Sequence, residues 1–277
     1  MIRLNHVSKI YGDGSKKAVD DLSWDIEDGK ITGFIGPNGA GKTTLMRIMT
    51  DLLAPSTGRV LLDGQDIAVM GAAFRKKLGY LPQDFGVYPN FTAEQFLLYI
   101  ARLKGLSKFE AKRQTDDLLR MVGLEDKKQK KLKGFSGGQR QRIGIARALS
   151  LNPRFLVCDE PVSALDVSIQ AQIVNLLVDL QKKMGLTYLF VAHDLSMVKH
   201  ISDRVAVLYL GTLVELTTSE ELYANPRHPY TQALLSAIPI PDPKVEAERD
   251  RKKIRLEGEV PSPINTKPGC KFQGRCT

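Results

Sequence analysis

A glycine-rich stretch at residues 36–44 carries the first residues whose types and spacing could do chemistry. Two glycines with four residues between them precede a lysine and a threonine, a pattern typical of a loop that binds phosphate. Glycines let backbone N–H groups turn toward phosphate oxygens, and a helix beginning near Lys42 would direct its positive dipole end at the same anion. We expect Lys42 to reach the terminal phosphates of a nucleotide and the Thr43 hydroxyl to bind Mg²⁺. The predicted loop consists of Gly36, Pro37, Asn38, Gly39, Ala40, Gly41, Lys42, Thr43 and Thr44.

Two adjacent carboxylates, Asp159 and Glu160, follow an apolar run at residues 155–158. Strands often end in acids, so alone this pattern would be structural as readily as functional. Downstream of a phosphate loop it predicts hydrolysis. Asp159 would hold Mg²⁺, directly or through water, and Glu160 would polarise a water for attack on a γ-phosphate.

A third motif, Ser136-Gly137-Gly138-Gln139, opens a predicted helix. In isolation it would be a helix-capping turn, but a serine hydroxyl and bare amides at a helix N-terminus also form an anion site. Here the sequence resembles the ATP-binding-cassette family, whose signature is this tetrad. The resemblance implies that Ser136, Gly137, Gly138 and Gln139 bind the γ-phosphate of an ATP held by the opposite subunit. The family usually has leucine where this chain has Phe135, one apolar residue for another.

The same resemblance assigns roles to four more residues. Tyr11 matches a ring that stacks on adenine, with a packed surface tyrosine as the structural alternative. Gln83 matches a glutamine that senses Mg²⁺ and couples to the membrane subunit. Asp166 ends a Ser-Ala-Leu-Asp loop that joins the two nucleotide sites of the family. His193, after a predicted strand, matches a histidine that contacts the γ-phosphate, although a lone histidine there would more often belong to the core.

The elements that must position these motifs alternate between strands and helices, which predicts an α/β fold with a largely parallel sheet. A short apolar strand enters the phosphate loop and residues 42–53 have helical spacing, a context that favours phosphate binding over a purely structural turn. Residues 92–122 are expected to be helical throughout. With the resemblance, the predicted fold is a P-loop NTPase: a RecA-like core with an antiparallel β subdomain and an inserted helical subdomain at about residues 88–150.

A C-terminal extension is predicted to follow this ATPase domain, with the domain at residues 1–225 and the proline-rich extension at 226–277. Residues 158–172, 225–235 and the tail resemble oligopeptide and dipeptide permease ATPases. Residues 79–95 instead resemble drug or peptide exporter ATPases. An unusual lineage and a recombinant of two relatives both remain open, and we weight the tail more heavily because such an extension is rarer than a loop variant.

The three cysteines argue against a disulfide framework, because their number is odd. Cys158 ends an apolar run and is expected to be a buried small residue. Cys270 and Cys276 stand near the C-terminus, where the peptide-permease family carries four cysteines that can hold an iron–sulfur cluster. Two thiolates cannot complete a Cys₄ shell, so the cluster is possible only if other residues complete it, and free thiols are the alternative.

The charge and hydropathy of the chain bear on its partners. A net charge of +9 suggests an anionic partner, and the basic run at residues 127–133 is expected to be a solvated loop, with acidic headgroups or RNA as alternatives. The longest mostly apolar stretch, at 205–214, is shorter than the roughly 20 residues of a spanning helix. The start of the chain lacks the apolar core of a secretory signal. We therefore expect the chain to stay in the cytosol unless a partner holds it at a membrane. The resemblance implies that it lies at the cytoplasmic face of the cell membrane.

The resemblance also implies the partners: transmembrane permease subunits, a second ATPase subunit that is identical or homologous, and, for an importer, indirectly a substrate-binding protein. No nucleic-acid partner is expected. The favoured function is ATP hydrolysis that powers peptide import. Its alternatives are an export motor with the same chemistry and, less favoured, a soluble ATPase outside transport.

Overall fold

The computed structural model describes residues 1–12, 14, 16–238, 254–258, 261–262, 264 and 269–276. Much of the predicted proline-rich and charged extension, at 239–253, lies outside these described residues. The chain divides into two compact units, which are described one at a time. The first comprises Met1–Ile26, Ile31–Val69 and Ala192–Thr277, and the second comprises Glu27–Lys30 and Met70–Val191.

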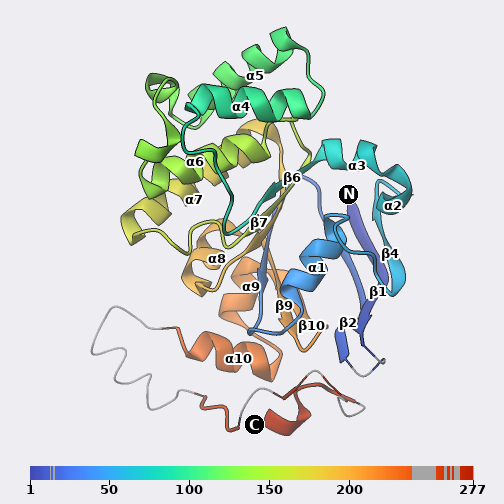
Figure 1. Cartoon of the computed structure of the whole chain (residues 1–277). Coiled ribbons are helices and arrows are strands. Elements are labelled where there is room, and N and C mark those ends of the chain that lie inside the picture. The colour runs from blue at the N-terminus through green and yellow to red at the C-terminus, as the bar shows by residue number, and fades with distance from the viewer. Residues whose placement is uncertain are drawn as a thin grey trace. The chain divides into compact units, whose positions relative to one another are not determined.

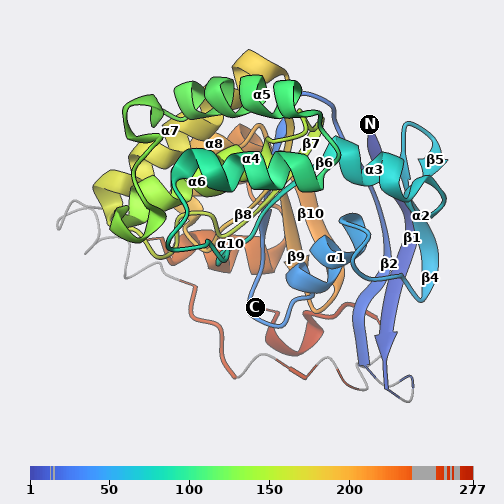
Figure 2. The same ribbon diagram turned by 45° about the horizontal axis from the view of Figure 1, so that its top comes forward.

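The first unit contains an antiparallel sheet with strand order β2-β1-β4-β5, whose strands are labelled in Figures 1 and 2. Alternating apolar residues of β2, from Leu22 through Trp24 to Ile26, turn inward and are buried, and the Trp24 ring stacks on Phe34 with centroids 5.8 Å apart. This alternation is what predicts a half-buried strand. The strands are β1 (Ile2–Tyr11), β2 (Lys16–Ile26), β4 (Thr57–Leu62) and β5 (Gln65–Asp66).

A second group of strands in this unit leads into the phosphate loop. Strand β3 (Ile31–Ile35) is buried at every residue and runs parallel to β9 (Arg204–Tyr209), which pairs antiparallel with β10 (Thr212–Thr218). Helix α1 (Lys42–Met49) follows β3 and ends four residues earlier than its apolar spacing predicts, before Asp51 turns the backbone to a φ of 59°. The unit also contains α2 (Ile67–Met70, whose last residue is assigned to the second unit), α8 (Leu195–Ile201), α9 (Ser219–Ala224), α10 (Pro229–Ser236) and the 3₁₀ turn Gln273–Arg275.

In the second unit, β7 (Phe155–Asp159) lies between β6 (Leu78–Leu81) and β8 (Thr187–Val191), and both pairings are parallel. The predicted parallel arrangement is therefore confirmed for these three strands. Helix α3 (Ala72–Lys77) precedes β6, and α7 (Val167–Met184) ends at Gly185, whose left-handed backbone is the usual way to stop a helix. Neither α7 nor any other helix among the described residues is long and apolar enough to cross a bilayer.

The helical block of this unit contains α4 (Ala93–Leu103), α5 (Lys108–Met121) and α6 (Gly137–Ala148), with 3₁₀ turns at Glu125–Lys127 and Leu132–Gly134 (Figure 2). The prediction of one continuous helix over 92–122 is wrong. Gly105, with a φ of +91°, ends the first helix. The Ser107 hydroxyl then accepts a hydrogen bond from the Glu110 amide and starts the second helix as part of a capping box.

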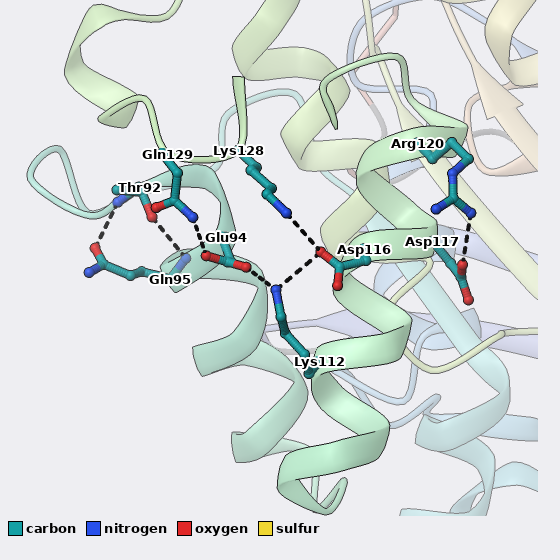
Figure 3. A network of polar contacts seen from close by, with 9 residues as sticks. All are labelled: Thr92, Glu94, Gln95, Lys112, Asp116, Asp117, Arg120, Lys128 and Gln129. Carbon is teal, nitrogen blue, oxygen red and sulfur yellow. Dashed lines mark hydrogen bonds and ion pairs between the residues drawn. The ribbon is translucent and has the colours of Figure 1, made fainter. Parts of the chain in front are cut away.

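The basic run at 127–133 is held against the start of α4 by main-chain contacts and by side-chain contacts, the latter drawn in Figure 3. The Glu94 amide donates to the Lys128 carbonyl at 3.0 Å, and the Gln129 amide group donates to the Glu94 carboxylate at 2.6 Å. Lys112 of α5 pairs with both Glu94 and Asp116. A hydrogen bond from Lys112, opposed by burial, lowers the pKa of Glu94. Gln129, Lys130, Lys131 and Lys133 are exposed, so the run is a solvated surface loop, as expected, and these contacts hold its start in place.

Part of the C-terminal extension packs into the first unit. Helix α10 belongs to this extension, and its residues Tyr230 and Leu235 are buried. Phe272, which is 1% exposed, lies against Tyr209 of β9 and Tyr230, with ring centroids 5.3 Å and 5.7 Å away. The extension therefore contributes to a core that its proline-rich composition does not predict.

Acidification should destabilise the start of α10 through His228. Its Nδ1 accepts a hydrogen bond from the Tyr230 amide at 3.1 Å, so the cap needs an unprotonated ring. Burial lowers the pKa of His228, and Glu215 opposes this. The unfolded chain then binds more protons, so stability is complete above the unfolded pKa of about 6.5 and falls as the pH drops below it.

The measurement is the melting temperature across this pH window for the wild type and for His228→Asn, which keeps a capping acceptor but does not titrate. We expect the melting temperature of the wild type to fall more steeply. Parallel curves would exclude His228 as the titrating group.

Candidate nucleotide-binding site

The expected site residues fall into two groups, one in each unit. The first unit contains Tyr11, the phosphate loop 36–44 and His193. The second contains Gln83, the tetrad 136–139, Asp159, Glu160 and Asp166.

The phosphate loop is shaped by glycines that leave no room for a side chain. A Cβ on Gly36 would lie 2.4 Å from the Leu208 carbonyl oxygen, and a Cβ on Gly41 would lie 2.1 Å from the Ala18 carbonyl oxygen. Gly41 also has a φ of +96°, in the left-handed region that favours glycine. It stands at the N-cap of α1 without a side-chain cap, so the first amides of that helix can point toward an anion.

Lys42 bridges the loop from within. Its ammonium group donates to the carbonyl oxygens of Gly36 at 2.6 Å and Pro37 at 3.0 Å, and the residue is 8% exposed. The next residue, Thr43, is exposed. A buried lysine, an exposed hydroxyl and a helix N-terminus within one short loop fit a triphosphate with its metal ion.

The other two residues of this group are exposed. Tyr11 ends β1 with 38% exposure, and the Lys9 ammonium lies 5.6 Å from its ring centroid. An accessible ring of this kind can stack on a base. His193 follows β8 by two residues and precedes Asp194, which caps α8.

In the second unit, the acidic pair ends β7 as predicted. The Asp159 carboxylate accepts a hydrogen bond from the Tyr80 hydroxyl at 3.4 Å, which adds a partner on β6. Glu160 has a φ of +46°, and its amide donates to the Val191 carbonyl at 3.0 Å. A glutamate in the left-handed region is strained, and such strain concentrates at functional sites.

Gln83 is connected to this acidic pair through Ser163. The Gln83 side-chain amide donates to the Ser163 hydroxyl at 3.2 Å, and that hydroxyl donates to the Glu160 carbonyl at 3.2 Å. The sequence places Ser163 only within the loop that ends at Asp166. Its bridging position could not be found from spacing, because Gln83 and Ser163 are 80 residues apart.

The tetrad forms the first turn of α6. Ser136 and Gln139 make a capping box, in which the Ser136 hydroxyl accepts from the Gln139 amide at 3.3 Å and the Gln139 side chain accepts from the Ser136 amide at 3.2 Å. A Cβ on Gly138 would lie 2.7 Å from the Ile169 side chain, so this glycine also has a packing role. Phe135 is buried, as expected for an apolar replacement of leucine.

Asp166 stands at the N-cap of α7 and is exposed. Its carbonyl accepts from the amides of Ile169 and Gln170, so the backbone begins the helix without help from the carboxylate. A second residue that sequence reasoning missed lies after Gln83: the Phe85 ring occupies the space over Gly144 of α6, where a Cβ would lie 2.4 Å away.

Comparisons with known proteins agree with this geometry. Residues 19–163 match the family described as ABC transporter, and residues 214–277 match the oligopeptide/dipeptide transporter C-terminal region. A putative oligopeptide transport ATP-binding protein of Bacillus subtilis, YkfD, is 49% identical over 97% of this chain and 85% of its own length. A putative peptide import ATP-binding protein of Brucella ovis is 48% identical over 94% of this chain and 83% of its own length.

Among solved structures, a dimeric ATP-binding cassette in a post-hydrolysis state with ADP and Pi bound has a TM-score of 0.68 and 29% identity. The likeness covers 79% of this chain and 99% of that one. Fold and comparisons together define the class, an α/β P-loop ATPase. The chain belongs to the ABC transporter family and is one of its ATP-binding subunits.

Replacing Gly41 by alanine should abolish nucleotide binding, because the new Cβ would collide with the Ala18 carbonyl while φ stays in the left-handed region. Gly29→Ala is the matched control. It has a φ of +67° with open space around the position, so it carries the left-handed strain of about 1 kcal/mol without a collision. Nucleotide affinity and thermal unfolding of both variants provide the test. Equal nucleotide affinities would show that the Ala18 contact does not shape the loop.

Proposed function

We propose that this chain binds and hydrolyses ATP in a head-to-tail pair with a second ATPase subunit. Residues 36–44 of one chain would hold the phosphates, Tyr11 the adenine, and the tetrad 136–139 of the other chain the γ-phosphate. Asp166 would lie near the junction of the two sites. The observation that carries the proposal is the phosphate loop itself, with buried Lys42 and Gly41 pressed against a carbonyl.

Hydrolysis would use the acidic pair. Glu160 would accept a proton from the attacking water, and His193 would contact the γ-phosphate. Thr43, Gln83 and Asp159 would hold Mg²⁺, which neutralises phosphate charge when bound. The hydrogen bonds from Gln83 through Ser163 to the Glu160 carbonyl support a role for Gln83 in signalling the state of this site.

Glu160→Gln should reduce steady-state phosphate release about a hundredfold or more, since it removes the general base, while ATP binding persists. Glu220→Gln, an exposed glutamate on α9, is the control and should keep wild-type turnover. Phosphate release and nucleotide affinity are measured on the same preparations. Turnover near the wild-type rate in Glu160→Gln would remove this residue from the role of base.

The transported substrate is proposed to be a peptide, moved inward. Support comes from the C-terminal match at 214–277 and from relatives described as peptide import proteins. YkfD matches over 97% of this chain, so both halves fall within one match. The partners would be transmembrane permease subunits, which hold the chain at the cytoplasmic face of the membrane, with a substrate-binding protein acting through them.

Export is the second candidate function, because residues 79–95 resemble exporter ATPases. This segment includes exposed Tyr88, which packs against Phe91 and Tyr99 with ring centroids 5.0 Å and 5.6 Å away. Both candidates share the same ATP chemistry and differ only in the partner.

Cellular uptake of a labelled tripeptide distinguishes the two directions. Cells that lack this chain should lose uptake, and wild type but not Glu160→Gln should restore it. If cells that lack the chain instead retain more labelled peptide, while the rate of peptide entry is unchanged, the result would contradict import and support export.

An iron–sulfur cluster at Cys270 and Cys276 would need ligands from other residues. Cys270 and Cys276 are exposed and supply only two thiolates, which do not complete a Cys₄ shell. Among the residues that the structure describes, no three histidine, cysteine or acidic side chains converge on one point.

A further inference from the structure

The last part of β9 and the turn that follows it contact the phosphate loop at two places. The Leu208 carbonyl lies against Gly36, where a Cβ would approach to 2.4 Å. Further along the loop, the Gly211 amide of the turn donates to the Ala40 carbonyl at 2.9 Å. A displacement of residues 208–211 would therefore move the loop at both Gly36 and Ala40.

The same turn is bonded to strand β2. The Asp20 amide donates to the Gly211 carbonyl at 2.9 Å. Two residues earlier, the Ala18 carbonyl lies against Gly211 and Gly41, with Cβ distances of 2.8 Å and 2.1 Å. Asp20 thus stands one backbone hydrogen bond from the turn and two from Ala40.

The C-terminal segment contacts this assembly at two points. The Lys271 ammonium pairs with the Asp20 carboxylate at 2.9 Å, and the two side chains are only 13% and 21% exposed. Beside it, the buried Phe272 ring packs on Tyr209, two residues before Gly211. Burial would raise the pKa of Asp20, but hydrogen bonds from Lys271 and Lys17 and their charges lower it overall.

We propose that Lys271 and Phe272 are positioning residues for the phosphate loop, so that docking of residues 269–276 and nucleotide binding stabilise each other. Lys271 acts through Asp20 and Gly211 on Ala40. Phe272 acts through Tyr209 on residues 208–211, which contact Gly36 and Ala40. Because linkage is reciprocal, a nucleotide that orders the loop also holds the C-terminal segment in place. The inference rests on the proposed nucleotide site and gives the peptide-transporter extension a role in it.

The test measures the affinity of full-length protein for Mg²⁺-ADP by calorimetry. Lys271→Ala should weaken binding about threefold to fivefold, the upper part of the range measured for solvent-accessible ion pairs. Phe272→Ala should weaken it further, since it removes a buried ring. Lys271→Arg should restore affinity, and Lys183→Ala, which removes an exposed lysine of α7, should leave affinity unchanged.

Two further measurements separate positioning from simple stabilisation. In an Asp20→Asn background, Lys271→Ala should cause no additional loss of affinity. Saturating ADP should slow hydrogen exchange at the amides of Gln273 and Arg275, which donate to Cys270 and Phe272 carbonyls. The proposal would be overturned if the variants lower the melting temperature without changing ADP affinity, and if ADP leaves hydrogen exchange at Gln273 and Arg275 unchanged.

Failure of this inference and failure of the proposed site give different results. If the wild type binds ADP and Lys42→Ala does not, the nucleotide site stands, and unchanged affinity in Lys271→Ala overturns only the positioning role. A wild type without ADP affinity would overturn both.

Discussion

The phosphate loop depends on a close contact between main-chain atoms, in which the Ala18 carbonyl packs directly against two glycines. The Ala18 carbonyl lies against Gly41 of the phosphate loop and Gly211 of the β9–β10 turn, both with left-handed backbones and no side chain. The three contacting residues, Ala18, Gly41 and Gly211, are distant in sequence, and none has a side chain that could relieve the contact by changing its rotamer. Such packing cannot adjust easily, because a Cβ added at either glycine would have to displace main-chain atoms. The loop is thus shaped by its neighbours as much as by its own glycines.

The second unit uses the opposite device, a strained residue held by hydrogen bonds. Glu160 keeps a left-handed backbone because its amide is bonded to β8 and its carbonyl receives the Ser163 hydroxyl. Strain at this residue persists only while those bonds persist. Because Gln83 donates to the same hydroxyl, a movement of the Gln83 side chain would alter the hydrogen bond that Ser163 makes to the Glu160 carbonyl. The tetrad helix is fixed more conventionally, through its capping box and the fit of Gly138 under Ile169.

The sequence predicts those features of the fold that follow from local patterns. The buried strands before the phosphate loop and before Asp159 are short apolar runs, and the structure places strands there. The apolar spacing continues across the break between α4 and α5 and so predicts one helix, although Gly105 and the Ser107–Glu110 pair signal the break. The burial of Phe272 could not be predicted, since its partner Tyr209 is 63 residues earlier and no periodic pattern connects them. The links of Gln83 and Lys271 to the site are long-range in the same sense. The roles of individual site residues remain predictions from motif and resemblance.

The three cysteines differ in exposure, so a thiol reagent would modify them selectively. Cys158 is fully buried within β7, and burial together with Asp159 raises its pKa, so it offers little thiolate to a reagent in solution. Cys270 and Cys276 are exposed and stand on either side of the docked Phe272. An alkylating dye added to the native protein would therefore attach at the C-terminal segment and leave the sheet unmodified. A dye attached in this way would report on the C-terminal segment without any engineered cysteine.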